Sequence, residues 1–290
     1  SGVGKKLYSQ LNALCKSGIE SRLIFCSNSN EVLFNQSNTR VYYCIHSDKL
    51  AKSLIGPVYR NIMYAYSLKK LIDSLDRGDV IYIRALSPNP FFLWPLRSSR
   101  DCLIVSEFQT IEPNEKKLSQ KFSFYLLLDA LFGGPLRKSL DGIVGVTEEI
   151  TNYQKRRSKK ELMPVTTIGN GVDVLSLPER KPPIYNGDFL DLLCVANFNY
   201  WHGLDRFLRG LATYSRKPRV VLHIAGGGAE LPHLQKQASD LGISNRVVFH
   251  GFLSGEALDD LFDQCHIAVG SLGIHRIGLK EASILKAREY

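Results

Sequence analysis

The stretch LDLLCVA at 190–196 begins a series in which short apolar segments alternate with longer amphipathic ones. The segments VVLHIA at 220–225, VVF at 247–249 and IAVG at 267–270 continue the series. Apolar segments of this length are typical of buried strands, and strands that alternate with helices predict a parallel sheet covered by helices. Residues 189–290 are therefore expected to form one Rossmann-like domain, with helices at Leu204–Ser215, Leu231–Leu241, Gly255–Gln264 and Ala282–Tyr290.

The same alternation fills the first half of the chain. Strands are expected at Ser21–Cys26, Val41–Ile45, Val80–Arg84, Cys102–Glu107, Gly142–Val146 and Val165–Ile168. Helices are expected at Lys5–Ser17, Tyr59–Leu75, Phe91–Arg97, Leu118–Leu131 and Glu148–Lys155. Residues 175–188 are rich in proline, glycine and charge and are expected to be a linker.

The sequence thus predicts an α/β protein with two doubly wound domains, at 1–174 and 189–290, facing each other across a cleft. We expect it to be truncated at both ends, because it begins at Ser1 and stops at Tyr290 within a helical pattern. Ligands of such sheets bind beyond the carboxyl ends of the strands.

Composition narrows the class of protein. The net charge is +9, and residues 1–173 carry 24 Lys and Arg against 16 Asp and Glu. Such a field suits nucleic acid, an anionic membrane or a phosphate-bearing substrate; no recognised nucleic-acid motif accompanies it. Six scattered cysteines favour reduced thiols in a cytoplasmic protein. No apolar stretch approaches the roughly 18 residues that a membrane-spanning helix needs. The sequence contains no Asp-x-Asp motif, the pair of carboxylates that would predict a metal site.

Two glutamates near the end of the chain are the most specific feature. Glu281 and Glu289 flank seven residues, which span a loop and the first turns of an expected helix. A helix start offers free N–H groups and a positive dipole end, which suit a diphosphate. A carboxylate one or two turns further on can accept both hydroxyls of a ribose. Two glutamates on a solvated helix face are the simpler alternative.

This run resembles the glutamate–seven–glutamate motif of the retaining glycosyltransferases of family 4, which have the GT-B fold. The resemblance implies that Glu281 faces the donor sugar, that Glu289 binds the ribose, and that Lys280 and Lys286 lie near the diphosphate. The segment Thr167–Asp173 is similar to the Asn-Gly-Val-Asp signature that closes the first domain in the same family.

A second segment departs from the family pattern. After the strand at 190–196, family members carry an arginine and a lysine that bind the diphosphate, whereas this chain has Asn197 and His202. His202 could supply a cation or a hydrogen-bond donor there. A histidine that only caps the next helix remains the alternative.

Three further loops are expected to contribute. Gly2 and Gly4 resemble the glycine-rich loop after the first strand of family members, where backbone N–H groups can approach a phosphate. A nucleotide-triphosphate P-loop is a weaker alternative, because Lys6 replaces the required hydroxyl. The loop of Gly251, Phe252 and Leu253 is expected to line the nucleobase pocket. Glu107 is expected on the acceptor side, with an ordinary exposed acidic loop as the alternative.

The resemblance implies an enzyme, a retaining hexosyltransferase that needs no metal or cofactor besides its nucleotide-sugar substrate. The implied acceptor is a glycan or a polyprenyl-linked sugar of surface polysaccharide biosynthesis. Basic and aromatic residues at Lys116–Leu131 leave open a peripheral contact with an anionic membrane or an ordinary core helix. A sugar-nucleotide-binding protein of weak activity and a GT-B epimerase remain the alternatives, and nucleic acid is not an expected partner.

Overall fold

The computed structural model describes residues 2–27, 39–43, 56–84, 87–118, 124–174, 180–181 and 183–284. The chain divides into two compact units, Ser1–Gly169 (unit 1) and Asn170–Tyr290 (unit 2). The division falls at the Gly169–Asn170 peptide, just before the segment in which we expect the linker.

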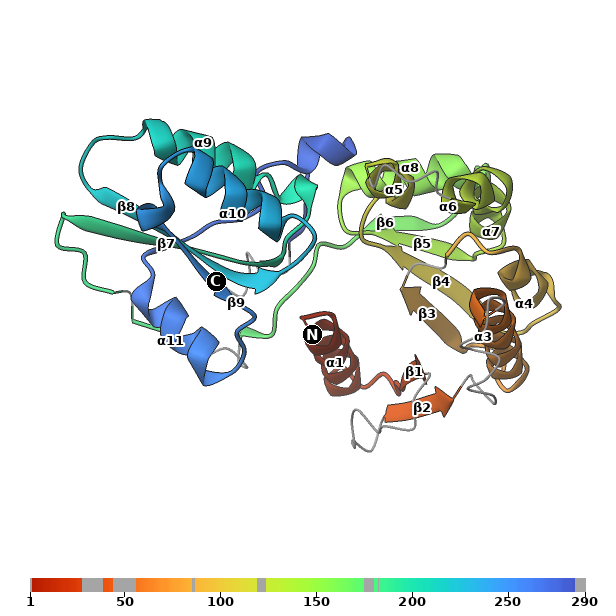
Figure 1. The fold of residues 1–290 in the computed structure, drawn as a ribbon. Helices are drawn as coiled ribbons and strands as arrows, with labels where there is room; N and C mark the ends of the chain where they lie inside the picture. Colours follow the sequence, from red (N-terminus) through yellow and green to blue (C-terminus); the bar gives the residue numbers. More distant parts are fainter. Residues whose placement is uncertain are drawn as a thin grey trace. The chain divides into compact units, whose positions relative to one another are not determined.

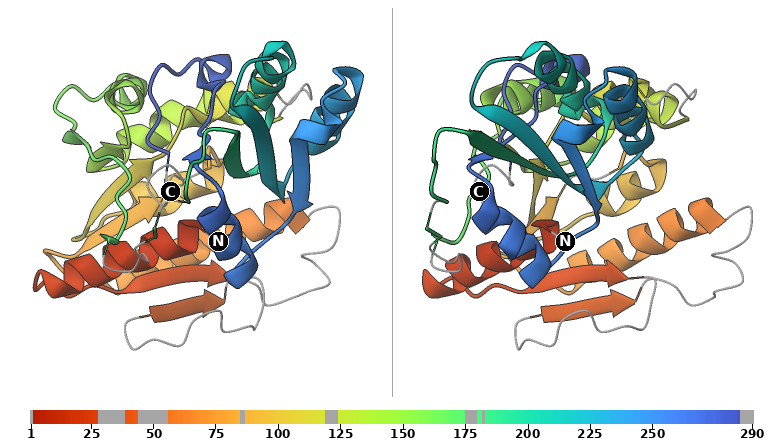
Figure 2. Two further views of the ribbon diagram at one scale, coloured as in Figure 1. Left: turned by 90° about the vertical axis from the view of Figure 1, so that its left-hand side faces the viewer. Right: turned by 60° about the vertical axis from the view of Figure 1, so that its left-hand side comes forward.

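Every strand described in unit 1 pairs in parallel. One sheet has the order β3 (Val80–Arg84), β4 (Leu103–Phe108), β5 (Gly142–Gly145), β6 (Val165–Thr167). A separate pair consists of β1 (Leu23–Ser27) and β2 (Thr39–Tyr43), beside which α1 lies (Figures 1 and 2). Each predicted strand of this half is present to within two residues; positions 44–45 lie outside the described residues.

The helices of unit 1 connect these strands. They are α1 (Gly2–Lys16), α3 (Gly56–Asp73), the 3-10 turn η1 (Pro90–Phe92), α4 (Leu93–Arg97), α5 (Glu112–Lys117), α6 (Phe124–Leu128), the π-helical turn η2 (Asp129–Gly133), α7 (Gly134–Lys138) and α8 (Glu148–Ser158). The Thr147 hydroxyl caps α8 by accepting from the Ile150 N–H. Such caps satisfy an amide that has no partner within the helix.

The predicted single helix over Leu118–Leu131 is wrong in its bounds. The described helix α5 ends at Lys117, and the chain after Phe124 changes from α-helix to π-helix at Asp129. The buried Asp129 carboxylate accepts from Arg157 at 2.7 Å and from Arg137 at 3.3 Å. A buried carboxylate is stable only when it is paired with cations of this kind. The π-helical turn also changes the direction in which the following side chains point. No local sequence pattern predicts that Asp129 pairs with Arg137 and Arg157.

Unit 2 contains one parallel sheet of order β10 (Ile267–Ala268), β7 (Phe189–Asn197), β8 (Arg219–Gly227), β9 (Val247–Gly251). Helices α9 (Leu204–Thr213) and α10 (Leu231–Asp240) cover one face, and α11 (Glu256–Gln264) lies against the other (Figures 1 and 2). Short 3-10 turns η4 (Tyr200–His202), η5 (Ser244–Arg246) and η6 (Ile274–Ile277) lie in the loops.

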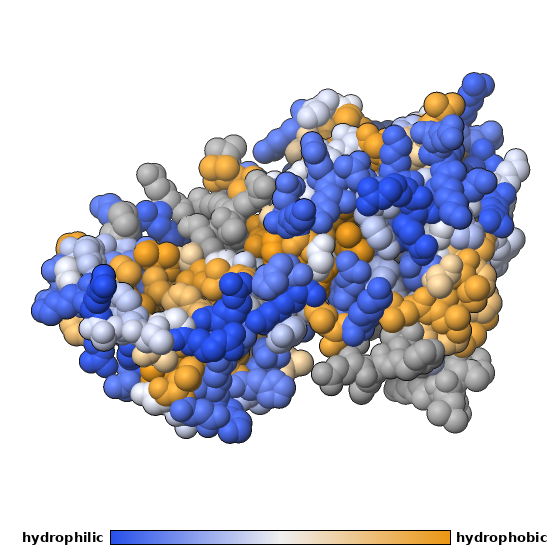
Figure 3. Space-filling model, turned by 90° about the horizontal axis from the view of Figure 1, so that it is seen from above, coloured by the Kyte–Doolittle hydropathy of each residue, from blue (hydrophilic) through white to orange (hydrophobic). Residues whose placement is uncertain are grey.

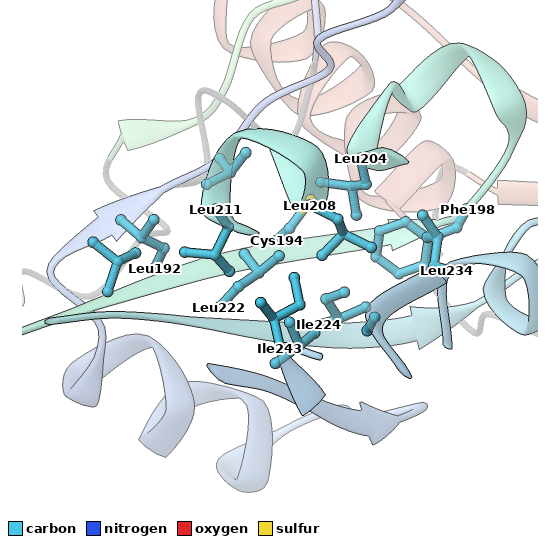
Figure 4. Packing of buried hydrophobic residues seen from close by; sticks show 14 residues of the cluster. Leu192, Cys194, Phe198, Leu204, Leu208, Leu211, Leu222, Ile224, Leu234 and Ile243 are labelled. Atoms are coloured by element: carbon cyan, nitrogen blue, oxygen red, sulfur yellow. The ribbon is translucent and has the colours of Figure 1, made fainter. Parts of the chain in front are cut away.

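The main core of unit 2 lies between its sheet and α9 and α10. Alternate residues of β7 and β8 point into it, because side chains of a strand alternate between its two faces. Leucines of α9 at spacings of three and four meet them (Figure 4). The labelled members of this core are Leu192, Cys194, Phe198, Leu204, Leu208, Leu211, Leu222, Ile224, Leu234 and Ile243.

The predicted helix at Ala282–Tyr290 is wrong at its start. Residues 281–284 have no regular secondary structure. Residues 285–290, which carry Lys286 and Glu289, lie outside the described residues.

Candidate functional site

The strand order of unit 2 locates a ligand site. From β7 the chain adds β8 and β9 on one side and then returns to place β10 on the other. The order therefore reverses between β7 and β10. Loops that follow such neighbouring strands diverge and leave a crevice at the carboxyl ends, where α/β proteins bind their ligands.

The two loops at this reversal contact each other through glycines. Gly203 has a φ of 71°, and a Cβ atom there would lie 2.6 Å from the backbone nitrogen of Gly273. The Leu272 N–H donates to the His202 carbonyl at 2.8 Å. A side chain at either glycine would push the loops apart, so the close approach depends on both.

An ion pair fixes the same two loops. The guanidinium of Arg276, in η6, donates to both carboxylate oxygens of Asp205 at 2.8 Å and lies 4.0 Å from the Tyr200 ring centroid. The hydrogen bond from Arg276 is the main reason why the pKa of Asp205 is below its usual value. Bidentate pairs of this kind impose geometry as well as charge, so the loops after β7 and β10 are held as one structure.

Asn197 is the last residue of β7, and His202 lies in the loop that follows. Asn197 is exposed at the end of the strand. The Asn199 N–H donates to Nδ1 of His202 at 3.0 Å. The same nitrogen lies 3.3 Å from the Asn199 carbonyl, and its role toward that carbonyl follows the tautomer of the ring. Together these contacts form the capping box of η4 and fix the ring against the backbone of Asn199.

The end of β8 and the turn that follows it pack closely against the same loop. Gly226 and Gly228 have φ values of 127° and 126°, and a Cβ atom on Gly228 would lie 2.3 Å from the backbone of Phe198. The Phe198 N–H donates to the Gly227 carbonyl at 2.5 Å, and the Phe198 side chain is completely buried. The glycines thus set the position from which Asn197 and His202 project.

The segment that carries Lys280 and Glu281 follows directly. Both residues are exposed, whereas Leu279 before them is buried. The Asn170 backbone N–H donates to the Ser283 hydroxyl at 2.7 Å, and its side-chain amide donates to the Ser283 carbonyl at 2.5 Å. The Asn-Gly-Val-Asp junction is thereby joined to the glutamate motif, 113 residues away in the sequence.

The loop after β9 presents its residues in different ways. Gly251 has a φ of 70°, and the Phe252 side chain is 83% exposed. Leu253 instead packs against the small core of Leu193, Ala225 and Leu261 beneath α11. Among these three expected pocket residues, Phe252 is the one open to a flat ligand.

In unit 1 the expected acceptor-side residue is part of a buried polar cluster. Glu107 is only 4% exposed, so the alternative of an ordinary exposed acidic loop is wrong. Its carboxylate lies 2.5 Å from the Lys6 ammonium and accepts from the Tyr82 hydroxyl at 2.7 Å. Gly2 and Gly4 form the first turn of α1, so the helix begins three residues before the predicted start and places Lys6 in its second turn.

The environment of Glu107 keeps it ionised. Burial alone would raise its pKa, but the hydrogen bonds from Lys6, Tyr82 and Gln10 together hold that pKa below its usual value. Burial, and then the hydrogen bond to Glu107, raise the pKa of the Tyr82 hydroxyl. Nη1 of Arg84, at the end of β3, is buried and has no partner among the described residues. A carboxylate and a cation are thus held at the carboxyl ends of β3 and β4.

A chain of titratable side chains crosses the α11 face of unit 2. The His223 and His250 rings stack, with Nδ1 of His223 3.0 Å from Nε2 of His250. Nε2 of His223 lies 3.2 Å from Asp191, and His266 lies 3.7 Å from the other oxygen of that carboxylate. Within the described ranges no three His, Cys, Asp or Glu side chains are arranged to hold a metal ion. Burial, and then the charge of His223, lower the pKa of His250.

His250→Gln is expected to flatten the pH dependence of stability. Because folding lowers the pKa of His250 from about 6.5, the unfolded chain binds the proton more readily, and the free energy of unfolding falls as pH drops through 6.5. Urea unfolding between pH 8 and pH 5 (roughly the range in which histidine titrates) measures this slope. The control is His233→Gln, an exposed histidine on α10. Equal slopes for the two variants would contradict the assignment.

Several residues that build the site escape local sequence patterns. Asp205, Arg276 and Ser283 act through contacts between loops far apart in the sequence, and their spacing matches no local rule. Gly203 gives a partial signal, because a glycine directly before a helix often marks a turn that needs a positive φ.

Unit 2 also matches a known family model. Residues 178–273 match the model described as Glycosyl transferases group 1. The match covers about one third of the chain and ends before Lys280 and Glu281.

One curated relative gives an alignment of similar extent. The GDP-mannose-dependent alpha-(1-6)-phosphatidylinositol monomannoside mannosyltransferase of Mycolicibacterium smegmatis is 32% identical over 101 residues, which is 32% of this chain and 26% of that protein. The chain aligns with about a fifth to a quarter of the length of the curated relatives it matches.

Solved structures share the fold over most of the chain. Sucrose-phosphate synthase from Thermosynechococcus elongatus superposes with a TM-score of 0.62 and 15% identity, covering 90% of this chain and 69% of that one. The Anabaena protein HepE, in complex with UDP and glucose, superposes with a TM-score of 0.51 and 17% identity, covering 79% of this chain and 59% of that one. The predicted fold class, α/β with parallel sheets of the GT-B type, is confirmed. In the described part of the chain, every helix is too short or too polar to cross a bilayer.

Proposed function

We propose that this chain is the catalytic part of a glycosyltransferase that uses a nucleoside-diphosphate sugar. The observation that carries the proposal is the reversal of strand order between β7 and β10, in the unit whose residues 178–273 match Glycosyl transferases group 1. The HepE structure with UDP and glucose supports a nucleotide-linked sugar as the ligand.

The donor is proposed to bind at the carboxyl ends of the unit 2 strands. Glu281 faces the sugar, and Glu289 accepts the ribose hydroxyls. Lys280 and Lys286 bind the diphosphate, with His202 and the Asn197 amide as further donors in place of the family's arginine and lysine. Hydrogen-bond donors and cations fixed before the reaction stabilise the negative charge that grows on the leaving phosphate.

The reaction is proposed to be hexosyl transfer with retention, without a metal. The departing phosphate takes the proton of the acceptor hydroxyl as the new glycosidic bond forms, so the mechanism requires no separate base. In unit 1, Glu107 and Arg84 lie at the carboxyl ends of β4 and β3 and are proposed to orient a glycan or polyprenyl-linked acceptor.

The enzyme is proposed to be cytoplasmic and to contact an anionic membrane. Phe124 is 65% exposed, and Leu127 and Leu131 on the following turns are also exposed. Lys116 and Lys117 end the preceding helix. The surface shown in Figure 3 is mainly polar, with apolar patches between. Exposed apolar side chains beside lysines suit the interface of an anionic bilayer, which supports assembly of a surface polysaccharide there.

Transfer assays with a panel of sugar nucleotides test the proposal. Removing a charge-assisted contact to the ribose or the sugar typically costs about 1.5–3 kcal/mol, so Glu281→Gln and Glu289→Gln are each expected to reduce kcat/KM at least about tenfold. The control is Glu256→Gln, at the exposed start of α11. Unchanged turnover in Glu289→Gln would refute its role at the ribose.

A sugar-nucleotide-binding protein of weak activity is the second candidate. It is favoured by Asn197 and His202 at the positions where the family pattern has an arginine and a lysine, since a neutral amide stabilises a leaving diphosphate less than a cation does. The test is calorimetric binding of the nucleotide sugar together with a transfer assay over several acceptors. Binding without any release of product would favour this candidate over the enzyme.

A further inference from the structure

A basic hollow lies at the end of the unit 2 sheet opposite the candidate donor site. Its volume is about 470 Å³, and it is formed where β7 and β8 begin. Figure 1 shows these starts at the ends of the strands away from the arrowheads. The lining residues are Asp188, Phe189, Tyr214, Ser215, Arg216, Lys217, Arg219 and Arg246.

The charge of this hollow is unbalanced. Four of its side chains are cationic and one is acidic. Among the described residues, the acid approaches a cation in one place, the 3.8 Å contact between Asp188 and the exposed Lys217. Arg216 makes no hydrogen bond or ion pair with any residue in the described ranges, and Arg219 makes one long bond, of 3.4 Å, to the Asn245 carbonyl. The hollow therefore has a net positive charge that the described part of the protein does not neutralise.

One of these cations is held rigidly. Nε of Arg246 donates to the Val220 carbonyl at 3.2 Å, and its Nη1 donates to the Leu211 and Tyr214 carbonyls at 2.9 Å. The guanidinium also lies over the Tyr214 ring. These bonds orient the group but use no carboxylate, so its charge persists. Its Nη2 donates to none of the described residues, and Arg246 is one of the residues that line the hollow.

The apolar side of the hollow suits a sugar ring. Phe189 is 50% exposed although it begins a strand, and it lies in the same lining as the arginines. An aromatic face can stack on the C–H groups of a pyranose, while guanidinium groups bind phosphate oxygens in pairs. A cavity of this volume is much larger than a phosphate ion alone requires.

From these observations we propose that the hollow binds a phosphorylated carbohydrate, with the phosphate on Arg216, Arg219 and Arg246 and the sugar ring on Phe189. This is a second ligand site, separate from the donor site at the carboxyl ends of the same strands. It requires no transferase activity, so it stands or falls independently of the proposed function.

Isothermal titration calorimetry with glucose 6-phosphate, inorganic phosphate and glucose tests this site, and the arginine variant below distinguishes it from the donor site. Glucose 6-phosphate is expected to bind more tightly than phosphate, and glucose is not expected to bind. Arg216→Ala/Arg219→Ala is expected to weaken binding at least about tenfold, since each lost charge-assisted bond costs about 1.5–3 kcal/mol. Lys236→Ala, an exposed lysine on α10, is the control and is expected to bind as the parent does.

Three outcomes would overturn the proposal. Equal affinity of the double variant and the parent would remove the site from the hollow. Equal affinity for phosphate and glucose 6-phosphate would remove the carbohydrate from the ligand. Binding to phosphatidylglycerol vesicles without binding to glucose 6-phosphate would make the hollow a lipid site. Because the substituted arginines are exposed, unchanged thermal unfolding will show that the variants are folded.

Discussion

Gly228→Ala is expected to destabilise unit 2 by about 3 kcal/mol or more, because a positive φ and a backbone clash each cost about 1–3 kcal/mol. The φ of Gly228 is 126°, and the added Cβ would lie 2.3 Å from the nitrogen and oxygen of Phe198. Phe198 is fully buried in the main core and cannot retreat. The strain would therefore displace the loop of Asn197 and His202, and donor affinity should fall together with stability.

Gly227→Ala is the matched control for this change. Gly227 is the neighbouring residue, at the end of β8, and an added Cβ there meets nothing within 4 Å. Its free energy of unfolding should change by less than about 1 kcal/mol. Urea unfolding of the two variants measures the difference. If Gly228→Ala and Gly227→Ala are equally stable, the close approach of the two turns does not position the loop.

The strands of both units could be predicted from the sequence because burial on both faces requires continuous apolar runs. Gly142–Gly145 and the centre of Phe189–Asn197 are the clearest cases. The π-turn at Asp129 could not be predicted, and its buried carboxylate pairs with Arg137 and Arg157, contacts that only the folded chain brings together.

The candidate site likewise has a part that the sequence predicts and a part that it does not. Asn197 and His202 follow a predicted strand, at the edge of the sheet where the carboxyl ends of parallel strands lie together. Glu281 lies in the segment that Ser283 joins to Asn170. The contacts that hold them depend on tertiary structure. Asn170 meets Ser283 across 113 residues, and Lys6 meets Glu107 across 101. Such pairs leave no periodic trace in a single sequence.

Glu107→Gln is expected to cost about 3–5 kcal/mol of unfolding free energy, because removing one partner of a buried ion pair leaves the other charge uncompensated. The Lys6 side chain is 5% exposed, so water cannot replace the carboxylate. The variant should also lose part of its acid sensitivity. Since folding lowers the pKa of Glu107, the carboxylate contributes stability above about 4.5 that disappears as pH falls through its folded value.

Two comparisons make this prediction specific to the pair. Glu20→Gln removes an exposed carboxylate that pairs with Arg22, and it should cost no more than about 1 kcal/mol. Lys6→Met/Glu107→Gln removes both charges, keeps an acceptor for the Tyr82 hydroxyl, and should be more stable than Glu107→Gln alone. Urea unfolding of the parent and of these three variants measures the differences. A double variant no more stable than Glu107→Gln would mean that the cost arises from the lost hydrogen bonds and not from an unpaired Lys6 charge.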